Sequence, residues 1–174
     1  MKKSLFQIPL TEIKEDTSLE FNGLNSGDLD LSLDRVNKFS KIQAKVSLIK
    51  KSLGVEANFI INFSAELICS RCLKLFLRNF NEKYHLEYIE GKDPLLALSR
   101  VELKSGDIDR VYFTGNTIDI SIGIRESIIL SIPTVPLCKE NCRGLCPVCG
   151  IDLNTNSCNC KIIKPNLFQP MSRR

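Results

Sequence analysis

The stretch VEANFIINFSAELICSRC, residues 55–72, alternates apolar and polar side chains over most of its length. Apolar residues fill the odd positions from Val55 to Cys69, and mostly polar residues fill the even ones. A period of two indicates a β-strand with one face in the core. A straight strand of this length would extend about 50 Å, which is long for a globular protein. We therefore expect it to bend, as strands do in a barrel or a strongly twisted sheet.

The segments on either side of this strand have a similar alternation. Residues 42–48 alternate in the same way, and the sequence KKSLG, residues 50–54, supplies a turn that ends in Gly54. These two runs predict a β-hairpin. Beyond Cys72 the apolar residues fall on odd positions up to residue 77 and on even positions from residue 84 to residue 88. This change of phase predicts another hairpin partner that contains a bulge.

A helix is predicted just before the C-terminal cysteines. An apolar stripe with a helical period begins after Asp119, which is a candidate N-terminal cap, and Pro133 and Pro136 end the helix. Residues 91–117 are rich in turn formers and charges, and they predict a loop with a short helix or strand. The residues of the helical stripe are Ile120, Ile124, Ser127, Ile128 and Ile132.

Charge is unevenly distributed along the chain, whose formal net charge is +4. Residues 1–34 carry three Lys against seven Asp or Glu, whereas residues 35–83 carry ten Lys or Arg against three Glu. Residues 129–174 are basic again, with six Lys or Arg against two acids. Two separated basic regions either converge on one phosphate-binding surface or remain solvated faces.

The apolar segments predict a protein without a membrane anchor that is cytoplasmic, or organellar after processing. The N-terminus begins with two lysines, but Gln7, Pro9 and Thr11 interrupt the apolar run that a secretory leader needs. The longest uncharged apolar stretch, residues 127–138, is shorter than the roughly 20 residues that cross a bilayer. In a reducing compartment, eight cysteines favour metal or redox chemistry over disulfides.

Six of the eight cysteines fall within PLCKENCRGLCPVCGIDLNTNSCNC, residues 136–160, and the other two form the motif Cys69-Ser-Arg-Cys72 between two predicted strands. Two thiolates three residues apart on a tight turn can bind one ion, and zinc prefers four such ligands in a tetrahedron. In Cys146-Pro-Val-Cys149-Gly150, the proline stiffens a similar turn and the glycine can adopt a positive φ. We predict two Zn²⁺ sites: Cys69, Cys72, Cys138 and Cys142 in the first, and Cys146, Cys149, Cys158 and Cys160 in the second.

These sites would organise the structure. The first would tie the hairpin tip to the end of the helix, and apparent zinc affinities of about 10–16 kcal/mol are comparable with the stability of a whole domain. The predicted fold class is α+β and mainly β: a twisted antiparallel sheet or partly open barrel with one amphipathic helix and a C-terminal zinc knuckle. The predicted parts are a β-rich body at residues 1–132, a Cys-rich metal-binding segment at 133–160 and a basic tail at 161–174.

Other interpretations of the cysteines stay open at this stage. An iron–sulfur cluster bound by thiolates is one alternative. The spacing from Cys142 to Cys149 matches the CxxxCxxC motif of radical S-adenosylmethionine enzymes, but these need a large α/β barrel after the motif and only 25 residues follow Cys149. A thioredoxin-like redox pair needs a CxxC that opens a helix in a βαβ unit, and neither CxxC has that setting.

Catalysis finds little support in the sequence. The one histidine, His85, lies at an exposed phase of an alternating strand, where a surface residue is commoner than a general base. We find no Gly-rich phosphate loop, nucleophile elbow or HExxH motif. Four thiolates around an ion also leave no open position for a catalytic water. The sequence therefore predicts a protein that is not an enzyme and has no small-molecule substrate.

Three features together resemble the YceD family, also named large ribosomal RNA subunit accumulation protein. They are the run IPTVPLCKENCRGLCPVCGIDLNTNSCNC at residues 132–160, Cys69-Ser-Arg-Cys72 after a long β stretch, and the ending KPNLF at residues 164–168. The resemblance covers most of the chain in layout and is specific over residues 119–168. It implies a bacterial or chloroplast protein of large-subunit ribosomal RNA accumulation or processing, with no established catalytic activity. Some members keep the hairpin cysteines without the second group, which implies separable modules.

The residues and the resemblance combine in one hypothesis: a zinc-binding factor that supports ribosome assembly by binding ribosomal RNA or a ribosomal protein. Phosphate contacts would make RNA binding strongly salt-dependent, and Phe76 and Phe80 could add base stacking, although burial in the core is commoner for such phenylalanines. The alternative is a protein-interaction adaptor without direct RNA contact, which the acidic residues of Glu12–Asp34 favour because ribosomal proteins are typically basic. The candidate RNA-binding residues are Lys45, Lys50, Lys51, Arg71, Lys74, Arg78, Lys161 and Lys164.

Overall fold

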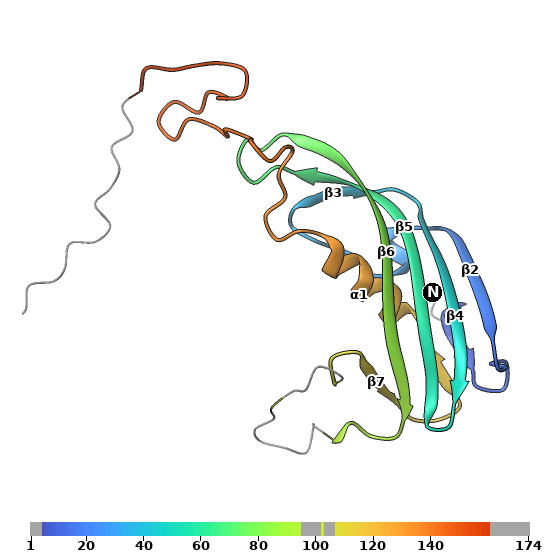
Figure 1. The fold of residues 1–174 in the computed structure, drawn as a ribbon. Coiled ribbons are helices and arrows are strands. Elements are labelled where there is room, and N and C mark those ends of the chain that lie inside the picture. The colour runs from blue at the N-terminus through green and yellow to red at the C-terminus, as the bar shows by residue number, and fades with distance from the viewer. Residues whose placement is uncertain (1–4, 95–101, 103–106, 161–174) are drawn as a thin grey trace, which may run out of the picture.

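The computed structural model describes residues 5–94, 102 and 107–160, and most of these belong to a long sheet and one helix (Figure 1). Lys161 and Lys164 therefore lie outside the described residues. The elements, in chain order, are β1 Gln7–Pro9, β2 Thr17–Leu24, the 3₁₀ turn Ser26–Asp28, β3 Val36–Phe39, β4 Ile42–Lys51, β5 Gly54–Ile68, β6 Leu75–Glu90, β7 Arg110–Phe113, β8 Thr117–Asp119 and α1 Ser121–Ser131.

The main sheet has the strand order β2-β4-β5-β6-β7, and β3 pairs with the end of β5 that lies beyond β4. All its pairs are antiparallel except β6 with β7, which is parallel. A separate two-stranded sheet joins β1 to β8. Within the described residues, the edge strands β2 and β7 do not pair with each other, so the sheet is open. The prediction of a mainly β, twisted sheet is confirmed, and the described part of the sheet does not close into a barrel.

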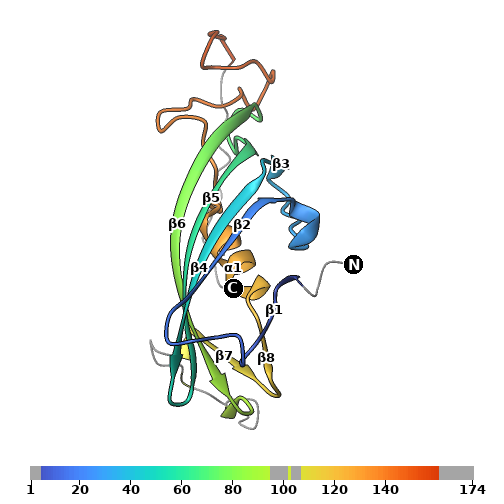
Figure 2. The ribbon, with the colours of Figure 1, turned by 90° about the vertical axis from the view of Figure 1, so that its right-hand side faces the viewer.

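Two long hairpins form the centre of the sheet. The predicted hairpin of β4 and β5 is confirmed, with Lys51 opposite Gly54 at its closed end. The β5–β6 register runs from Gly54 opposite Ile89 to Ile68 opposite Leu75 without a shift, so the predicted bulge is wrong. The change of phase has another cause: Leu75 and Leu77 lie on the outer face of β6, where 51% and 69% of their surface is exposed. Both strands bend, and they curve around α1 (Figures 1 and 2).

The core lies between the inner face of the sheet and α1. The alternating apolar residues of β4 and β5 are buried there, together with Ile124 and Ile128 of the helix. The Tyr88 hydroxyl donates to the backbone carbonyl of Asp119 at 2.9 Å, so this buried phenol has a partner. The Asp119 carboxylate accepts the backbone N–H of Ser121 at 2.9 Å. The predicted helix is confirmed, although its N-cap is Ile120 rather than Asp119, and it leads directly into the cysteine-rich segment.

Three N-terminal strands had no prediction from the sequence. Strands β1, β2 and β3 lie in the acidic N-terminal region and at its border, and β7 lies in the segment expected to hold a loop with a short helix or strand. That segment also includes residues 95–101 and 103–106, which lie outside the described residues. None of the described helices has the length and apolar character needed to span a membrane.

Candidate metal centres

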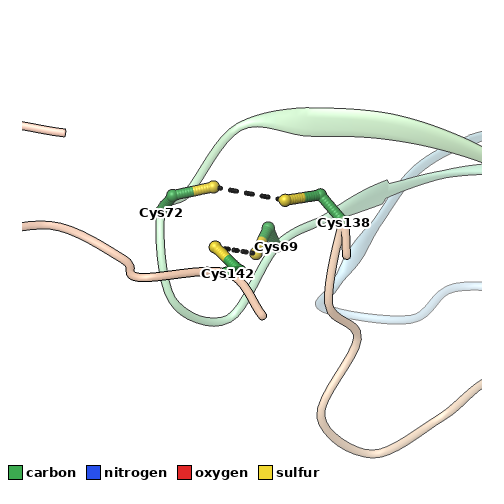
Figure 3. A group of neighbouring side chains, drawn as sticks. All are labelled: Cys69, Cys72, Cys138 and Cys142. Carbon is green, nitrogen blue, oxygen red and sulfur yellow. Dashed lines mark hydrogen bonds between the residues drawn. The ribbon is translucent and has the colours of Figure 1, made fainter. Parts of the chain in front are cut away.

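Four cysteines meet at the end of the β5–β6 hairpin. This proximal group consists of Cys69 and Cys72 from the hairpin turn and Cys138 and Cys142 from the segment after α1 (Figure 3). Their four Sγ atoms lie within 4.8 Å of one another. The Sγ atoms of Cys69 and Cys142 are 3.8 Å apart, and those of Cys72 and Cys138 are 3.7 Å apart. Side chains separated by 73 and 66 residues thus converge on one point.

A second group lies entirely within the C-terminal segment. This distal group consists of Cys146, Cys149, Cys158 and Cys160, and its Sγ atoms also lie within 4.8 Å of one another. Cys146 is buried, Cys149 is exposed, and the other two are half-buried. The structure therefore brings the eight cysteines together in the two groups of four that their spacing predicted.

Both groups begin with the same backbone turn. The backbone N–H of Leu73 donates to the carbonyl of Cys69 at 2.9 Å, and the N–H of Gly150 donates to the carbonyl of Cys146 at 2.9 Å. The residue after each CxxC has a positive φ, 59° for Leu73 and 72° for Gly150. Glycine adopts this conformation without the steric cost that a leucine has. The two turns are therefore alike in shape, although only the distal one carries the residue that suits it.

Backbone amides favour a thiolate at Cys69 in the proximal group and at Cys146 in the distal group. Burial would raise the pKa of Cys69, but hydrogen bonds from the backbone amides of Cys72, Cys138 and Arg71 outweigh it and lower this pKa to about 6. The backbone amides of Cys149 and Val148 lower the pKa of Cys146 to about 6 in the same way. Such amide donors are what a metal-bound sulfur accepts in protein sites.

Two thiols in each group have a raised pKa, Cys72 and Cys138 in the proximal group and Cys158 and Cys160 in the distal group. Burial, followed by the neighbouring thiols, raises the pKa of Cys138 to about 12. A hydrogen bond with the Cys149 thiol is the largest of the effects that raise the pKa of Cys160 to about 12. Repulsion between thiolates in a small volume opposes the ionisation of all four thiols, and a bound divalent cation would offset this repulsion. Each group is thus an arrangement of sulfurs that a cation would complete.

The sulfur separations fit one tetrahedral ion in the proximal group. Four sulfurs about 2.3 Å from a zinc ion lie about 3.8 Å from one another at tetrahedral angles. The Cys69–Cys142 and Cys72–Cys138 separations of 3.8 and 3.7 Å match this edge length. A four-iron cluster binds each thiolate to a different iron, so its sulfurs would have to lie farther apart. The donor set and its size therefore fit a single Zn²⁺ or a single iron.

Two polar side chains near the proximal group, Asn154 and Asp152, were not among the predicted site residues. Asn154 Nδ2 lies 3.5 Å from Cys142 Sγ. Asp152 Oδ2 lies 2.5 Å from Lys74 Nζ, and Lys74 follows Cys72 by two positions. The only signal in the sequence was the Asp-Leu-Asn run between the two halves of the distal group. Asp and Asn are common in turns, but the run does not indicate which residues the turn contacts.

The candidate RNA-binding residues are spread over the length of the sheet. Lys50 and Lys51 lie at the β4–β5 turn, whereas Arg71 and Lys74 lie at the cysteine end of the same long hairpins (Figure 1). Lys45 lies 3.3 Å from Glu20, and Lys51 lies 2.9 Å from Glu56. Three of the four described candidate lysines, Lys74 included, thus face an acid within the chain.

The remaining candidates have different surroundings. The Arg71 guanidinium donates to the backbone carbonyl of Cys142 at 2.9 Å, so it helps to hold the proximal group. Arg78 is exposed and lies over the ring of Phe80, 5.4 Å from its centroid. Phe80 is buried and stacked on Phe63 at 4.7 Å, so the expectation that it stacks on a base is wrong. His85, on the outer face, has its Nδ1 3.1 Å from the Asn58 amide oxygen.

Comparisons with known proteins identify relatives of the chain. The model of the family described as Large ribosomal RNA subunit accumulation protein YceD matches residues 57–172, about two thirds of the chain. A chloroplastic protein of Zea mays named Large ribosomal RNA subunit accumulation protein YCED homolog 1 is 48% identical over 56 residues, which are 30% of this chain and 19% of that protein. The Arabidopsis thaliana protein of the same name is 24% identical over 185 aligned positions, 87% of this chain and 58% of that protein. The chain thus spans less than two thirds of either relative, and no solved structure matches it.

Proposed function

Because this chain belongs to the YceD family, whose description names large ribosomal RNA subunit accumulation, we propose that it is a non-catalytic zinc-binding factor of ribosome assembly. In this proposal it supports the accumulation or processing of large-subunit ribosomal RNA by binding that RNA or a ribosomal protein. The names of its plant relatives also contain the words large ribosomal RNA subunit accumulation protein. The proposal includes a reducing compartment such as the cytoplasm, where thiols stay free to bind metal.

The single observation that carries the zinc part is the convergence of eight thiols into two groups of four. A compact set of four soft thiolates favours zinc, which takes four such ligands in a tetrahedron. Four sulfur ligands leave no position on the ion for water or substrate, so the ions would hold structure together. The proximal ion would join the hairpin turn to the segment after α1, and the distal ion would close the C-terminal knuckle.

Elemental analysis of protein purified without oxygen tests this part. We expect two zinc ions per chain and no acid-labile sulfide. Iron with sulfide would support an iron–sulfur protein instead, and metal-free folded protein or stable disulfides would contradict the proposal. As a matched control, the double substitution of Cys158→Ser and Cys160→Ser is expected to lower the zinc content from two ions to one.

The RNA part depends on exposed cations near the cysteine end of the sheet. Arg78 is exposed on β6, and Arg71 and Lys74 lie in the neighbouring turn. Lys74 is paired with Asp152, and Arg71 donates to backbone carbonyls. Both side chains would therefore contact phosphates in addition to these partners. Filter binding of large-subunit ribosomal RNA across a salt series tests the contact, since phosphate contacts weaken steeply as salt rises. Absent or salt-insensitive binding would contradict it.

A second candidate function, a protein-interaction adaptor, is favoured by the outer surface beside the proximal group. Leu73, Leu75 and Leu77, at alternate positions of the chain, are 62%, 51% and 69% exposed there. Leu73 also has a positive φ, which costs a leucine stability. Clustered exposed apolar side chains mark protein contacts more often than nucleic-acid contacts. Co-purification from nuclease-treated extract separates the two functions, because ribosomal proteins that remain bound support the adaptor.

A further inference from the structure

The loop between the two halves of the distal group, residues 150–157, contacts the proximal group. Asn154 Nδ2 lies 3.5 Å from Cys142 Sγ. The backbone N–H of Leu153 donates to the carbonyl of Gly144 at 2.9 Å, and Asp152 forms an isolated antiparallel bridge with Leu145. The loop therefore lies against the proximal group although both of its ends belong to the distal group.

The Asn154 amide has one orientation that satisfies its partners. Its Oδ1 accepts the backbone N–H of Arg143 at 2.9 Å, and its Nδ2 donates to Asp152 Oδ1 at 2.7 Å. A flipped amide would place its oxygen against a carboxylate and its NH₂ against an N–H donor. In the orientation that remains, the second N–H is available to the sulfur of Cys142. A metal-bound thiolate accepts a hydrogen bond of this kind.

Asp152 connects the same loop to the hairpin. One carboxylate oxygen lies 2.5 Å from Lys74 Nζ, and the other accepts the backbone N–H of Asn154 at 2.9 Å. The Asp152 side chain is only 13% exposed, so water screens these contacts less than it does at an open surface. Asp152 therefore fixes the turn that carries Asn154 and anchors that turn beside Cys72.

The segment that joins the two groups is in close contact with the hairpin turn. The backbone N–H of Leu145 donates to the carbonyl of Arg71 at 3.1 Å. A Cβ at Gly144 would lie 2.9 Å from that same carbonyl oxygen, and Gly144 has a φ of +73°. Any larger residue would have to push the segment away from the turn. The contact between the two groups thus includes main chain as well as side chains.

We propose that Asn154 is a positioning residue for the proximal metal site and that an ion in the distal group strengthens metal binding in the proximal group. This rests on the proposed function, because it needs an ion in each group. The distal ion fixes Cys149 and Cys158, the ends of the loop, so less conformational freedom is lost when Asn154 contacts Cys142. Binding linkage is reciprocal, so the proximal ion strengthens distal binding by the same factor. Outer partners of metal ligands typically change affinity about 10- to 100-fold, and we expect about tenfold here.

The first test uses the full chain loaded with Cd²⁺ and compares two asparagines of one loop. Asn156 is the matched control, because among the described residues its Nδ2 donates within the loop, to Thr155 Oγ1 at 3.0 Å. The cadmium NMR spectrum should contain two signals, and Asn154→Ala should shift the proximal one while Asn156→Ala leaves both in place. The proximal Zn²⁺ affinity, measured against a chromogenic chelator, should fall about tenfold in Asn154→Ala alone. Equal behaviour of the two variants would overturn the role of Asn154.

Asn154→Asp separates the sulfur contact from the contact with Arg143. It keeps an oxygen for the Arg143 N–H, but it replaces the donor with an oxygen that faces both Asp152 and the Cys142 sulfur. We expect a loss of proximal affinity at least as large as in Asn154→Ala. Unchanged affinity in Asn154→Asp would show that the N–H donor is irrelevant and would overturn the proposal.

The second test removes the distal ion with Cys158→Ser and Cys160→Ser, and circular dichroism checks that the body stays folded. The remaining proximal ion should bind about tenfold more weakly than in the wild-type chain. Wild-type affinity in this variant would overturn the coupling. The outcomes also separate the two proposals. A wild-type chain that binds no metal contradicts the proposed function, whereas one that binds two ions independently contradicts only this inference.

Discussion

The proximal and distal groups have the same four ligands and the same turn, but they differ in how they relate to the rest of the chain. In the proximal group the facing cysteines are 66 and 73 residues apart, and three of the four are buried. The distal cysteines all lie within residues 146–160, and Cys149 is exposed. One ligand set thus cross-links distant parts of the body, whereas the other closes a short loop.

Because of this difference, we expect the span of each cross-link to determine how much it stabilises the protein. The loop-closure entropy that a cross-link removes from the unfolded chain grows with the number of residues enclosed. An ion in the proximal group would therefore stabilise the whole body, because it joins the β5–β6 hairpin to the end of the helix segment. An ion in the distal group would order its own loop, and it would affect the body only through the contacts of that loop.

Removal of the proximal ligands is expected to have the largest effect. With Cys72→Ser and Cys138→Ser, the free energy of unfolding should fall by about 4 kcal/mol, the loop-closure value for a cross-link of this span. Urea unfolding of the zinc-loaded proteins, followed by far-UV circular dichroism, measures the change. The control, Cys149→Ser with Cys160→Ser, should lose no more than about 1.4 kcal/mol, which corresponds to a tenfold coupling between the sites. Equal losses in the two double variants would contradict the comparison.

The order in which a chelator removes the two ions should follow the exposure of their cysteine ligands. A chelator is expected to take the distal ion first, because Cys149 is exposed while Cys69, Cys72 and Cys142 are buried. Release should therefore have two phases, and the change in near-UV circular dichroism should accompany the second. Simultaneous recording of chelator absorbance and circular dichroism measures both. A single phase, or structural loss with the first ion, would show that the two sites do not differ as argued.

The sequence predicted the strands that carry the proximal group because their alternation is long and regular. Burial on one face sets the register of β4 and β5, and the same alternation places Cys69 and Cys72 at the end of a strand. Alternation does not say which of two faces is the inner one. The leucines at 75 and 77 therefore looked like core residues with a bulge after them, although they lie on the outer face.

Other features depend on long-range pairing that no local pattern contains. Strand β3 has only four residues, none of them buried, and it pairs with β5 through contacts such as Val36 with Leu67. The contact of Asn154 with Cys142 likewise depends on the path of the chain between the two groups. Counting cysteines gave the grouping, since four plus four was the economical division. Whether each group binds zinc stays a prediction.

Exchange of the residues after the two CxxC motifs tests the likeness of the two turns. Leu73→Gly should raise the free energy of unfolding by about 1 kcal/mol, because it removes a left-handed leucine. Gly150→Leu should lower the stability of the distal site by about 1 kcal/mol for the same reason. Urea unfolding measures the first change, and chelator competition measures the second. Losses of stability in both variants would mean that the two turns are held by different contacts.

Substitution of the exposed leucines should have the smallest effect on stability and the clearest effect on partners. Leu75→Ser with Leu77→Ser should change the free energy of unfolding by less than about 0.5 kcal/mol per residue, because exposed side chains contribute little. The ribosomal proteins that co-purify after nuclease treatment should nevertheless be lost. Leu53→Ser is the matched control, because Leu53 is 77% exposed at the opposite end of the hairpins and the variant should keep the partners.

Val148, which is 63% exposed on the distal turn, allows the same test at the distal group. If Val148→Ser removes the partners while the leucine pair keeps them, the distal group provides the contact and the proximal group only stabilises the body.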